Sequence, residues 1–426
     1  MPSLPQRLDS CGSVAVVMSR FPAVTETFIL RELIALEDQG VPVVLVPLLR
    51  DEVSTLHPEA AAWDARALYT PFVNGAILAS NLRVFISSPG RYVGTLLRLL
   101  WEARGSGNAL AGTLGIFPKS VYNGQRLRAL GVHHVHAHFG NHPATAAYVM
   151  KRVRRRGEAE LPYSLTLHAH DIFVHQAGLL RKLLAAEFVR SISRFNVEFL
   201  TRRFPGALDA KRFRVIHCGI DPARYRHRPR PGAPGRDRSL HLLSIAGLRP
   251  YKGLSHLIEA VGRMRAAAVD VCCDVIGDGP LRSQLEAQIA RSGLERHVRL
   301  LGTKNQDEVA RALELCDVFV LPSVAAPNGE MEGIPVALME SLAAGVPTVS
   351  TRLSGIPELV IDGVTGFLAD PADPGALTAA VERIIDDYPK ALEIAQEGSR
   401  LVRTEFEIGT NVGRLVDEIG LRRSVA

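Results

Sequence analysis

The nonapeptide Glu332-Gly333-Ile334-Pro335-Val336-Ala337-Leu338-Met339-Glu340 places a proline and an apolar, helix-forming run between two glutamates. Pro335 suits the first position of a helix, where its missing N–H would have no acceptor in any case. Gly345 suits the left-handed residue that ends such a helix. Glu332 therefore precedes a helix N-terminus, whose unpaired N–H groups favour an anion such as phosphate. Glu340 lies inside the helix.

The spacing of these glutamates permits two interpretations. At roughly 1.5 Å per helical residue, Pro335 and Glu340 lie about 8 Å apart along the helix axis. This separation suits one carboxylate at the sugar and another at the ribose of a nucleotide-diphosphate sugar. Alternatively, Glu332 caps the helix and Glu340 is a solvated surface residue, because a motif of two residues is weak evidence by itself.

Length and composition predict a globular protein of two or three domains. The chain has 426 residues, of which 47% are hydrophobic and 22% are charged. No apolar run approaches the roughly 20 residues that span a bilayer, and the first eleven residues lack the pattern of a secretory signal. The five cysteines are odd in number and show no CxxC spacing. We therefore expect reduced thiols and a cytoplasmic location.

The formal net charge of +6 predicts attraction to an anionic partner. Two segments are candidates for contact with an anionic membrane: the basic run 151–156 and the amphipathic, arginine-bearing segment 76–104. Each segment also has a structural interpretation. The basic run could be a solvated helix end that the helix dipole favours. The segment 76–104 could be a helix packed on the core of its own domain. Zinc-finger spacing, aromatic RNA-binding motifs and basic-zipper patterns are absent from the sequence, so nucleic acid is not an expected partner.

Alternating strand and helix patterns in both halves predict an α/β protein with mostly parallel sheets. We expect strands at 13–18, 41–46, 132–137, 163–167, 214–217, 240–246, 271–276, 298–301, 318–321 and 347–351. The predicted domains are 1–220 and 239–401. The segment 221–238, rich in proline, arginine and glycine, is the predicted linker, and 402–426 is the predicted helical tail.

Loops that follow strands of the second half carry the residues most suited to an anionic ligand, because ligands of open α/β sheets bind beyond the carboxyl ends of strands. Arg249 and Lys252 follow the strand 240–246 and could hold a diphosphate. Gly277 and Gly279 form a tight turn after the strand 271–276. The loop before Glu332 follows the strand 318–321.

Histidines mark the first half. His134, His136 and His138 alternate along one strand, but no neighbouring carboxylate or cysteine completes a metal site, so we favour hydrogen-bonded structural groups. His168, His170 and Asp171 follow the strand 163–167, where a histidine can contact a sugar hydroxyl. Arg20 follows the first strand at the corresponding edge.

The sequence contains no Asp-x-Asp, the usual arrangement for holding a divalent metal on a nucleotide diphosphate. We therefore expect Arg249, Lys252 and helix N-termini to neutralise the diphosphate. The sequence predicts an activity that requires no divalent metal and no cofactor besides the nucleotide-sugar donor.

Together these segments resemble the retaining glycosyltransferases of family 4, the group 1 type with the GT-B fold. The matching segments of the second half are Lys252-Gly253, 277–280, 317–323, 332–340, 345–347, 355–358 and 363–366. In the first half, the segments 19–22, 25–28, 136–139 and 168–171 are similar to the colanic-acid and exopolysaccharide branch. The resemblance covers most of the chain, apart from 53–122, the linker and the tail.

This resemblance implies a fold and a set of residue roles. The fold would be two Rossmann-like domains facing a central cleft, with a C-terminal helix crossing back to the first domain. The implied catalytic residues are Glu332, His168 and Lys252, and Glu332 positions the sugar and need not be a nucleophile. The implied donor-binding residues are Arg249, Lys252, Gly277, Gly279, Gly333, Ile334 and Glu340, and the acceptor-side residues are Arg20, His138, His170 and Asp171. Gly247 stands where the family commonly has an arginine, a role that Arg249 could take.

The implied function is transfer of a hexosyl group, with retention, from a nucleotide-diphosphate sugar to a saccharide acceptor in surface polysaccharide biosynthesis. The acceptor would be a saccharide or a lipid-linked saccharide, and the protein would act in the cytoplasm, with peripheral contact to the inner face of the membrane. Two alternatives stay open: a nucleotide-sugar epimerase of the same fold, and a catalytically silent binding partner in a polysaccharide-assembly complex.

Overall fold

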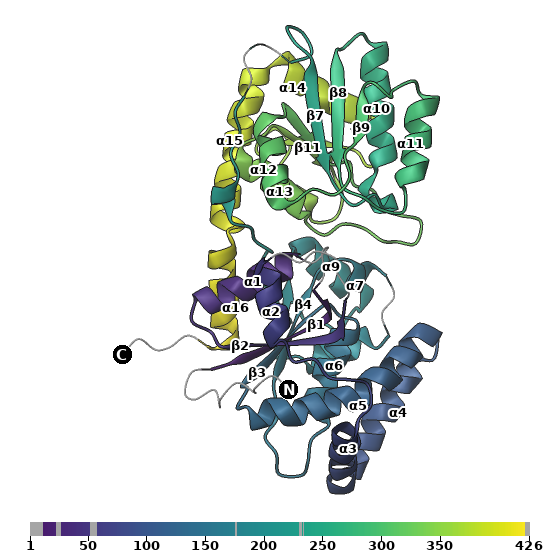
Figure 1. Ribbon diagram of the computed structural model, residues 1–426, viewed down its shortest axis with the longest axis vertical. Coiled ribbons are helices and arrows are strands. Elements are labelled where there is room, and N and C mark those ends of the chain that lie inside the picture. The colour runs from purple at the N-terminus through teal and green to yellow at the C-terminus, as the bar shows by residue number, and fades with distance from the viewer. Residues whose placement is uncertain are drawn as a thin grey trace. The chain divides into compact units, whose positions relative to one another are not determined.

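The chain folds into two compact units (Figure 1). The computed structural model describes residues 12–22, 27–51, 58–174, 177–229, 232 and 234–421. The first unit comprises the described residues up to Ile192, Val197–Ile216 and those from Val412 onward, and the second comprises Ser193–Asn196 and His217–Asn411. The C-terminal helix α16 (Ile408–Ile419) thus returns the chain to the first unit. Among the described residues, no helix combines the length and apolar character needed to span a membrane.

The first unit is built on a parallel sheet of six strands in the order β2-β1-β3-β4-β5-β6. These strands are β1 (Val14–Phe21), β2 (Val43–Arg50), β3 (His134–His138), β4 (Tyr163–Leu167), β5 (Val189–Ser191) and β6 (Phe213–Val215). Every residue of the central strands β3 and β4 is buried, as expected where helices cover both faces of a parallel sheet.

The helices of the first unit follow the strands in alternation, with an additional group between β2 and β3. They are α1 (Thr27–Asp38), α2 (Pro58–Arg66), α3 (Gly75–Ser87), α4 (Pro89–Ala103), α5 (Gly107–Ala129), α6 (His142–Arg152), α7 (His170–Phe173), α8 (Leu179–Ala185), α9 (Arg194–Arg203, whose first residues belong to the second unit) and the short 3-10 turn Ala210–Arg212.

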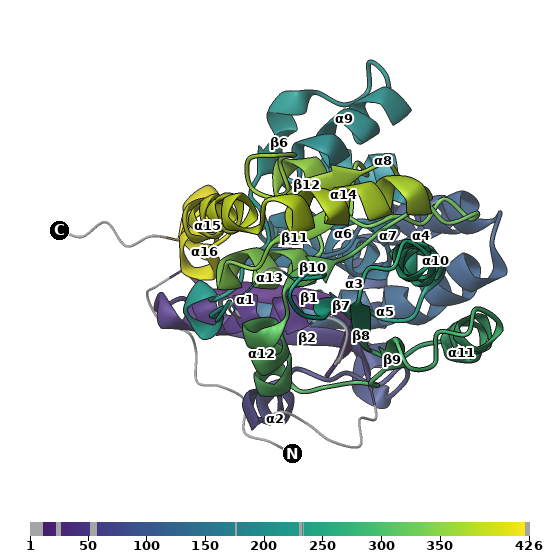
Figure 2. The ribbon, with the colours of Figure 1, turned by 90° about the horizontal axis from the view of Figure 1, so that it is seen from above.

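The second unit has its own parallel six-stranded sheet, in the order β12-β11-β10-β7-β8-β9. Its strands are β7 (Leu240–Ile245), β8 (Val271–Ile276), β9 (Val298–Leu300), β10 (Val318–Val320), β11 (Thr348–Thr351) and β12 (Phe367–Ala369). Its helices are α10 (Leu254–Ala266), α11 (Arg282–Arg291), α12 (Gln306–Leu315), α13 (Val336–Ala344), α14 (Pro374–Asp386) and α15 (Tyr388–Glu405), with 3-10 turns at Pro222–Arg224, Pro250–Lys252 and Ile356–Glu358. Figure 2 shows α10 and α14 on one side of this sheet and α12 and α13 on the other.

Each sheet contains a point where the direction of strand addition reverses. In the second unit the chain proceeds from β7 to β8 and β9 on one side, and then from β10 to β11 and β12 on the other. In the first unit the reversal lies between β1 and β3. Ligands of open α/β sheets bind outside the carboxyl ends of the strands at this kind of point, which directs attention to the loops after β7 and β10.

The predicted α/β class with parallel sheets is confirmed, and each predicted strand overlaps an observed one. The strands β5 and β12 were not predicted. One local prediction is wrong: Pro335 is the N-cap residue, with φ −64° and ψ 131°, and the helix begins at Val336. Gly345 ends that helix with φ 83°, as predicted. The predicted domain boundaries at 220, 238 and 401 stay predictions.

Candidate active site

Close backbone contact joins the loops that follow β7 and β10. Gly253 has φ +67°, and a Cβ atom built on it would lie 1.9 Å from the carbonyl oxygen of Pro322. The amide of Val324 donates to the carbonyl of Tyr251 at 2.9 Å. Only glycine permits this approach, because any side chain there would collide with backbone. Lys252, the residue before Gly253, is thereby fixed beside the loop that leads to Glu332.

The loop after β8 contacts the loop after β7 in the same way. A Cβ atom on Gly277 would lie 1.9 Å from the carbonyl oxygen of Ala246, and one on Gly279 would lie 2.8 Å from that of Leu248. The Leu248 amide also donates to the Asp278 carbonyl at 3.0 Å. The predicted tight turn at these glycines is therefore present, and it forms the backbone support of the loop after β7.

Lys252 and Glu332 form an ion pair through Nζ and Oε1, and both side chains are largely buried, with 15% and 12% of their surface exposed. The ring of Tyr251 lies beside Lys252 Nζ, 5.4 Å from its centroid, and burial followed by the charge of Glu332 raises the pKa of Tyr251 to about 12. The structure thus brings together two of the predicted catalytic residues. Arg249, by contrast, is exposed at the start of the 3-10 turn.

Glu340 is buried inside α13, so the interpretation of a solvated surface residue is wrong. Its Oε1 accepts a hydrogen bond from the hydroxyl of Tyr225 at 2.7 Å, and that hydroxyl accepts one from Nε2 of Gln306 at 3.2 Å. Tyr225 is only 1% exposed, although it lies in the segment predicted to be a linker. The Glu340 carboxylate is therefore held from a second element of the same unit.

Gly333 and Ile334 are buried just before the N-terminus of α13. Gly355 allows this packing, since a Cβ atom on it would lie 2.9 Å from Cγ1 of Ile334. The first-turn N–H groups of a helix have no intrahelical acceptor and favour an anion. Glu332, the N-terminus of α13 and Lys252 therefore occupy one end of the second sheet.

In the first unit, His168 is enclosed by aromatic rings. The ring centroids of Phe28, Phe139 and His138 lie 4.8, 4.6 and 5.5 Å from that of His168. Phe139 has φ 74°, an uncommon conformation for a bulky residue. Burial, and to a smaller extent the electrostatic effect of His138, lowers the pKa of His168 well below its usual value. The ring of His168 is therefore neutral near pH 7.

A chain of polar contacts leads from His168 into the core of this unit. His138 Nδ1 lies 3.2 Å from His168 Nε2, and His138 Nε2 lies 3.2 Å from Glu32 Oε1. Glu32 Oε2 is 2.5 Å from NH1 of Arg190, which is fully buried. Burial by itself would raise the pKa of Glu32, but Arg190 and then His138 lower it well below its usual value. His138 thus lies between the ring of His168 and the Glu32 carboxylate.

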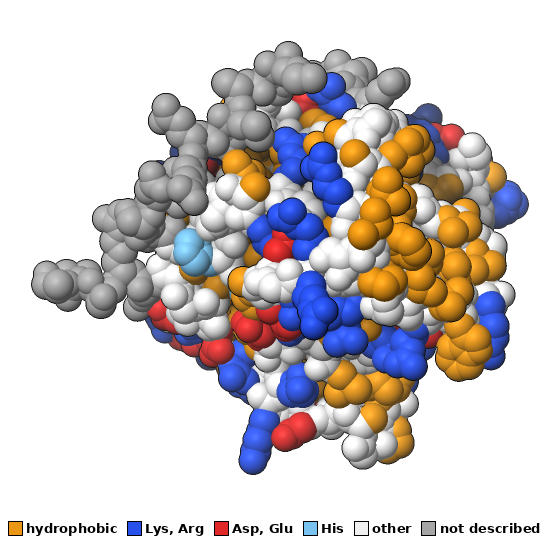
Figure 3. All heavy atoms as spheres, turned by 90° about the horizontal axis from the view of Figure 1, so that it is seen from below, with side chains coloured by type: hydrophobic (Ala, Val, Ile, Leu, Met, Phe, Trp, Pro, Cys, Tyr) orange, Lys and Arg blue, Asp and Glu red, His pale blue; other side chains and the backbone are white. Residues whose placement is uncertain are grey.

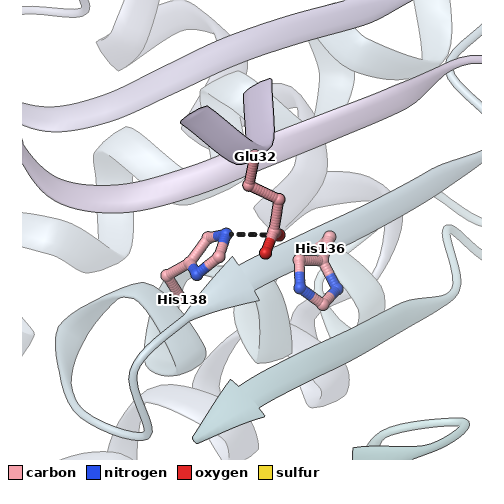
Figure 4. Close-up of side chains that lie close together, drawn as sticks. All are labelled: Glu32, His136 and His138. Atoms are coloured by element: carbon pink, nitrogen blue, oxygen red, sulfur yellow. Dashed lines mark ion pairs between the residues drawn. The ribbon is translucent and has the colours of Figure 1, made fainter. Parts of the chain in front are cut away.

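Glu32 also places a carboxylate beside the histidines of β3, although no carboxylate lies near these histidines in the sequence. Ligand atoms of Glu32, His136 and His138 lie within 4.8 Å of one another (Figure 4), so the expectation that no carboxylate is near these histidines is wrong. Both ring nitrogens of His136 have hydrogen-bond partners, however, namely Ser164 and Thr166, each at 2.7 Å. Glu32 pairs with Arg190 and with His138, so hydrogen bonds and two ion pairs account for the group as a structural network.

The other predicted acceptor-side residues differ in their exposure. Asp171 is fully buried, and its carboxylate accepts from the amides of Gly140 at 2.7 Å and His168 at 3.1 Å. Burial raises the pKa of Asp171, and these amides oppose the rise. Asp171 therefore joins the loops after β3 and β4. His170 is exposed, and Arg20 is exposed and pairs with Asp51 at 2.9 Å.

Four residues of these networks were missed in the sequence. Glu32 and Arg190 have a recognisable signal, because each is a charged residue among apolar positions of a buried helix face or strand. Tyr225 was hidden by the composition of its neighbours, and Phe139 by a backbone conformation that sequence alone does not reveal.

Comparison with known proteins identifies related sequences. The family model described as "Glycosyl transferases group 1" matches residues 230–401. A protein named for colanic acid biosynthesis, the glycosyltransferase WcaL of Salmonella typhimurium, is 30% identical over 376 residues, which cover 86% of this chain and 89% of that protein. The amylovoran biosynthesis glycosyltransferase AmsK of Erwinia amylovora is 39% identical over 197 residues, 46% of this chain and 48% of that protein.

Solved structures share the fold at low sequence identity. Anabaena HepE, in complex with UDP and glucose, is 18% identical with a TM-score of 0.66, over 96% of this chain and 99% of that one. Sucrose-phosphate synthase from Thermosynechococcus elongatus is 16% identical with a TM-score of 0.65, over 96% and 99%. The two parallel six-stranded sheets thus have the GT-B fold that the sequence predicted.

Replacing Tyr225 with phenylalanine tests whether this tyrosine positions Glu340 for ligand binding. A hydrogen bond to a charged group contributes roughly 1.5 kcal/mol or more, so we expect Tyr225→Phe to weaken binding of a nucleoside diphosphate about tenfold. Calorimetric titration with uridine, guanosine and adenosine diphosphates provides the measurement. Tyr163→Phe is the matched control, because the Tyr163 hydroxyl donates to the Lys182 carbonyl at 2.6 Å within the first unit. Equal loss in both variants would contradict a specific role for Tyr225.

Proposed function

Because this chain belongs to the group 1 glycosyltransferases, we propose that it transfers a hexosyl group, with retention of configuration, from a nucleotide-diphosphate sugar to a saccharide. The donor diphosphate binds the second unit at Lys252 and the N-terminus of α13. Glu332 contacts the sugar hydroxyls and Glu340 the ribose. Gly333 and Ile334 present backbone N–H groups to the same ligand, while Arg249 adds an exposed cation.

The Lys252–Glu332 ion pair is the observation that carries this proposal. A largely buried lysine beside the end of a parallel sheet offers a fixed positive charge to a diphosphate. Glu332 is held in position by that lysine before the donor arrives. The two charges therefore form a preorganised contact for a ligand that combines an anion with hydroxyl donors.

The reaction that we propose takes place on one face of the sugar. The bond between the anomeric carbon and the diphosphate oxygen breaks, and the acceptor hydroxyl oxygen forms the new bond to that carbon. The proton of this hydroxyl passes to the leaving phosphate. Lys252 stabilises the charge that develops on the phosphate, Glu332 positions the sugar, and His168 contacts a sugar hydroxyl.

The relatives named for amylovoran and colanic acid biosynthesis support a role in surface exopolysaccharide assembly. We propose that the acceptor is a lipid-linked saccharide and that the reaction occurs in the cytoplasm at the inner face of the membrane. An epimerase of the same fold would convert the donor without an acceptor, so product analysis with and without a saccharide acceptor separates the two activities.

Replacing Glu332 tests the assignment of the donor site. We expect Glu332→Ala to lower transfer at least about 100-fold, a loss typical of removing one group that positions or stabilises the reacting centre. Initial rates of sugar transfer from the nucleotide donor supply the readout, and circular dichroism verifies the fold. Glu382→Ala, which removes the same side chain from an exposed position on α14, serves as the control. Near wild-type transfer by Glu332→Ala would refute the site.

We also propose that the reaction requires no divalent metal, since Lys252 and the N-terminus of α13 neutralise the diphosphate. Transfer rates measured with and without a chelator such as EDTA, after removal of the free metal, are therefore expected to agree within about twofold. Strong inhibition by the chelator, reversed by added magnesium or manganese, would contradict this expectation.

A further inference from the structure

We propose that the outer face of α3 and α4, together with Phe72, Val73 and Leu114, docks on a bilayer that contains anionic lipids. We call these residues the docking surface. The inference deepens the proposed function, on which its biological purpose rests, by naming the partner that holds the enzyme near a lipid-linked acceptor. The binding itself is a physical property that can be measured without any sugar transfer.

Exposed apolar side chains are concentrated in this part of the first unit. Among the described residues, 16 large hydrophobic side chains are exposed, and ten of them lie between residues 72 and 114. Ile86, Trp101 and Leu97 expose 70%, 63% and 61% of their surface. Figure 3, which views the molecule from below, shows hydrophobic side chains gathered along one side, with Lys and Arg side chains beside them. Exposed apolar patches of such extent usually mark interaction sites. The members of the docking surface are Phe72, Val73, Leu78, Leu82, Phe85, Ile86, Val93, Leu97, Trp101 and Leu114.

The two helices do not need this face for their own packing. The sequence predicted one amphipathic segment at 76–104, but the structure divides it at Ser88 into α3 and α4. Ile77 and Val84 of α3 and Leu99 of α4 are buried, and Tyr92 packs edge-to-face on Phe117 of α5, with centroids 5.1 Å apart. One face therefore packs on the unit's own core, as the structural interpretation held, while the opposite face remains apolar and exposed.

The charges on α3, α4 and the residue that follows α4 complement an anionic surface. Arg83, Arg91, Arg98 and Arg104 are all exposed. The two helices contain one acidic residue, Glu102, which is mostly buried and pairs with Arg181 at 2.5 Å. Apolar side chains flanked by arginines, with no exposed carboxylate, are typical of helices that lie in the interface of a membrane.

Trp101 and Arg104 form an arrangement suited to the headgroup region. The guanidinium carbon of Arg104 lies 4.0 Å from the ring centroid of Trp101, and both side chains are exposed. Tryptophan is enriched at membrane–water interfaces, where an arginine on its face can reach lipid phosphates while the ring enters the apolar boundary.

The basic run 151–156 is the other segment that the sequence suggested for membrane contact. Several of its side chains form ion pairs within the protein. Lys151 and Arg154 pair with Glu160 at 3.1 and 3.2 Å, and Arg155 pairs with Glu158 at 2.5 Å. These carboxylates cancel much of the positive charge that the run would offer to lipid. The structure thus favours α3 and α4 over this run as the site of membrane contact.

Vesicle sedimentation tests the proposal with the full chain. We expect the protein to pellet with vesicles of phosphatidylcholine containing phosphatidylglycerol, and to pellet less as salt is raised, because salt screens exposed charges. The double substitution Arg91→Gln with Arg98→Gln should lower the partition coefficient about 25-fold, since each arginine near an anionic surface contributes about fivefold. The triple substitution of Ile86, Leu97 and Trp101 by serine should abolish pelleting.

The matched control is Leu315→Ser with Arg403→Gln, which removes an exposed leucine and an exposed arginine from the second unit and should pellet like the wild type. The proposal fails if the wild type stays in the supernatant, or if the docking-surface variants pellet unchanged. It also fails if sedimentation velocity without vesicles shows a dimer that the triple substitution dissociates, because the surface then binds a second copy. Vesicle binding without any sugar transfer would support docking and refute the proposed function instead.

Discussion

The close backbone contact among the loops after β7, β8 and β10 is the constraint on which the candidate donor site depends. Gly253, Gly277 and Gly279 bring main-chain atoms of neighbouring loops to distances that no side chain would permit. Lys252 is the residue next to one of these contacts, and its position relative to Glu332 follows from them. If this loop were flexible, ligand binding would have to order the ion pair at a cost in entropy. The glycines hold the loop in place, and they therefore favour ligand binding without touching a ligand.

In the first unit, a buried polar network, and not close backbone contact, positions the candidate site residue His168. Arg190, Glu32 and His138 connect the core of the sheet to His168, and the low pKa of His168 keeps its ring neutral in a site lined by aromatic side chains. Buried charges are costly unless they are paired, so Glu32 and Arg190 depend on each other. His138, 3.2 Å from His168 and 3.2 Å from Glu32, links this pair to the ring of His168 and holds that ring in position.

Much of this organisation could be predicted from the sequence. The alternation of strands and helices gave the α/β class, and Gly345 and the glutamates around Pro335 located α13 to within one residue. Contacts between distant residues could not be predicted, since no local pattern links Tyr225 to Glu340 or Glu32 to His138. The burial of Asp171 was missed for a different reason: its partners are backbone amides, which leave no trace in residue type. Lys252 could be proposed from its place after a strand of the second half, whereas its pairing with Glu332 came from the structure.

Calorimetric titration of the wild type and Lys252→Met with the nucleoside diphosphate that binds the wild type most tightly tests the central claim most directly. A charge-assisted hydrogen bond to phosphate contributes roughly 1.5–3 kcal/mol, so the account predicts at least about tenfold weaker binding by Lys252→Met. Lys304→Met, which changes an exposed lysine of the same unit, should bind like the wild type. Equal affinities of the wild type and Lys252→Met would contradict the account.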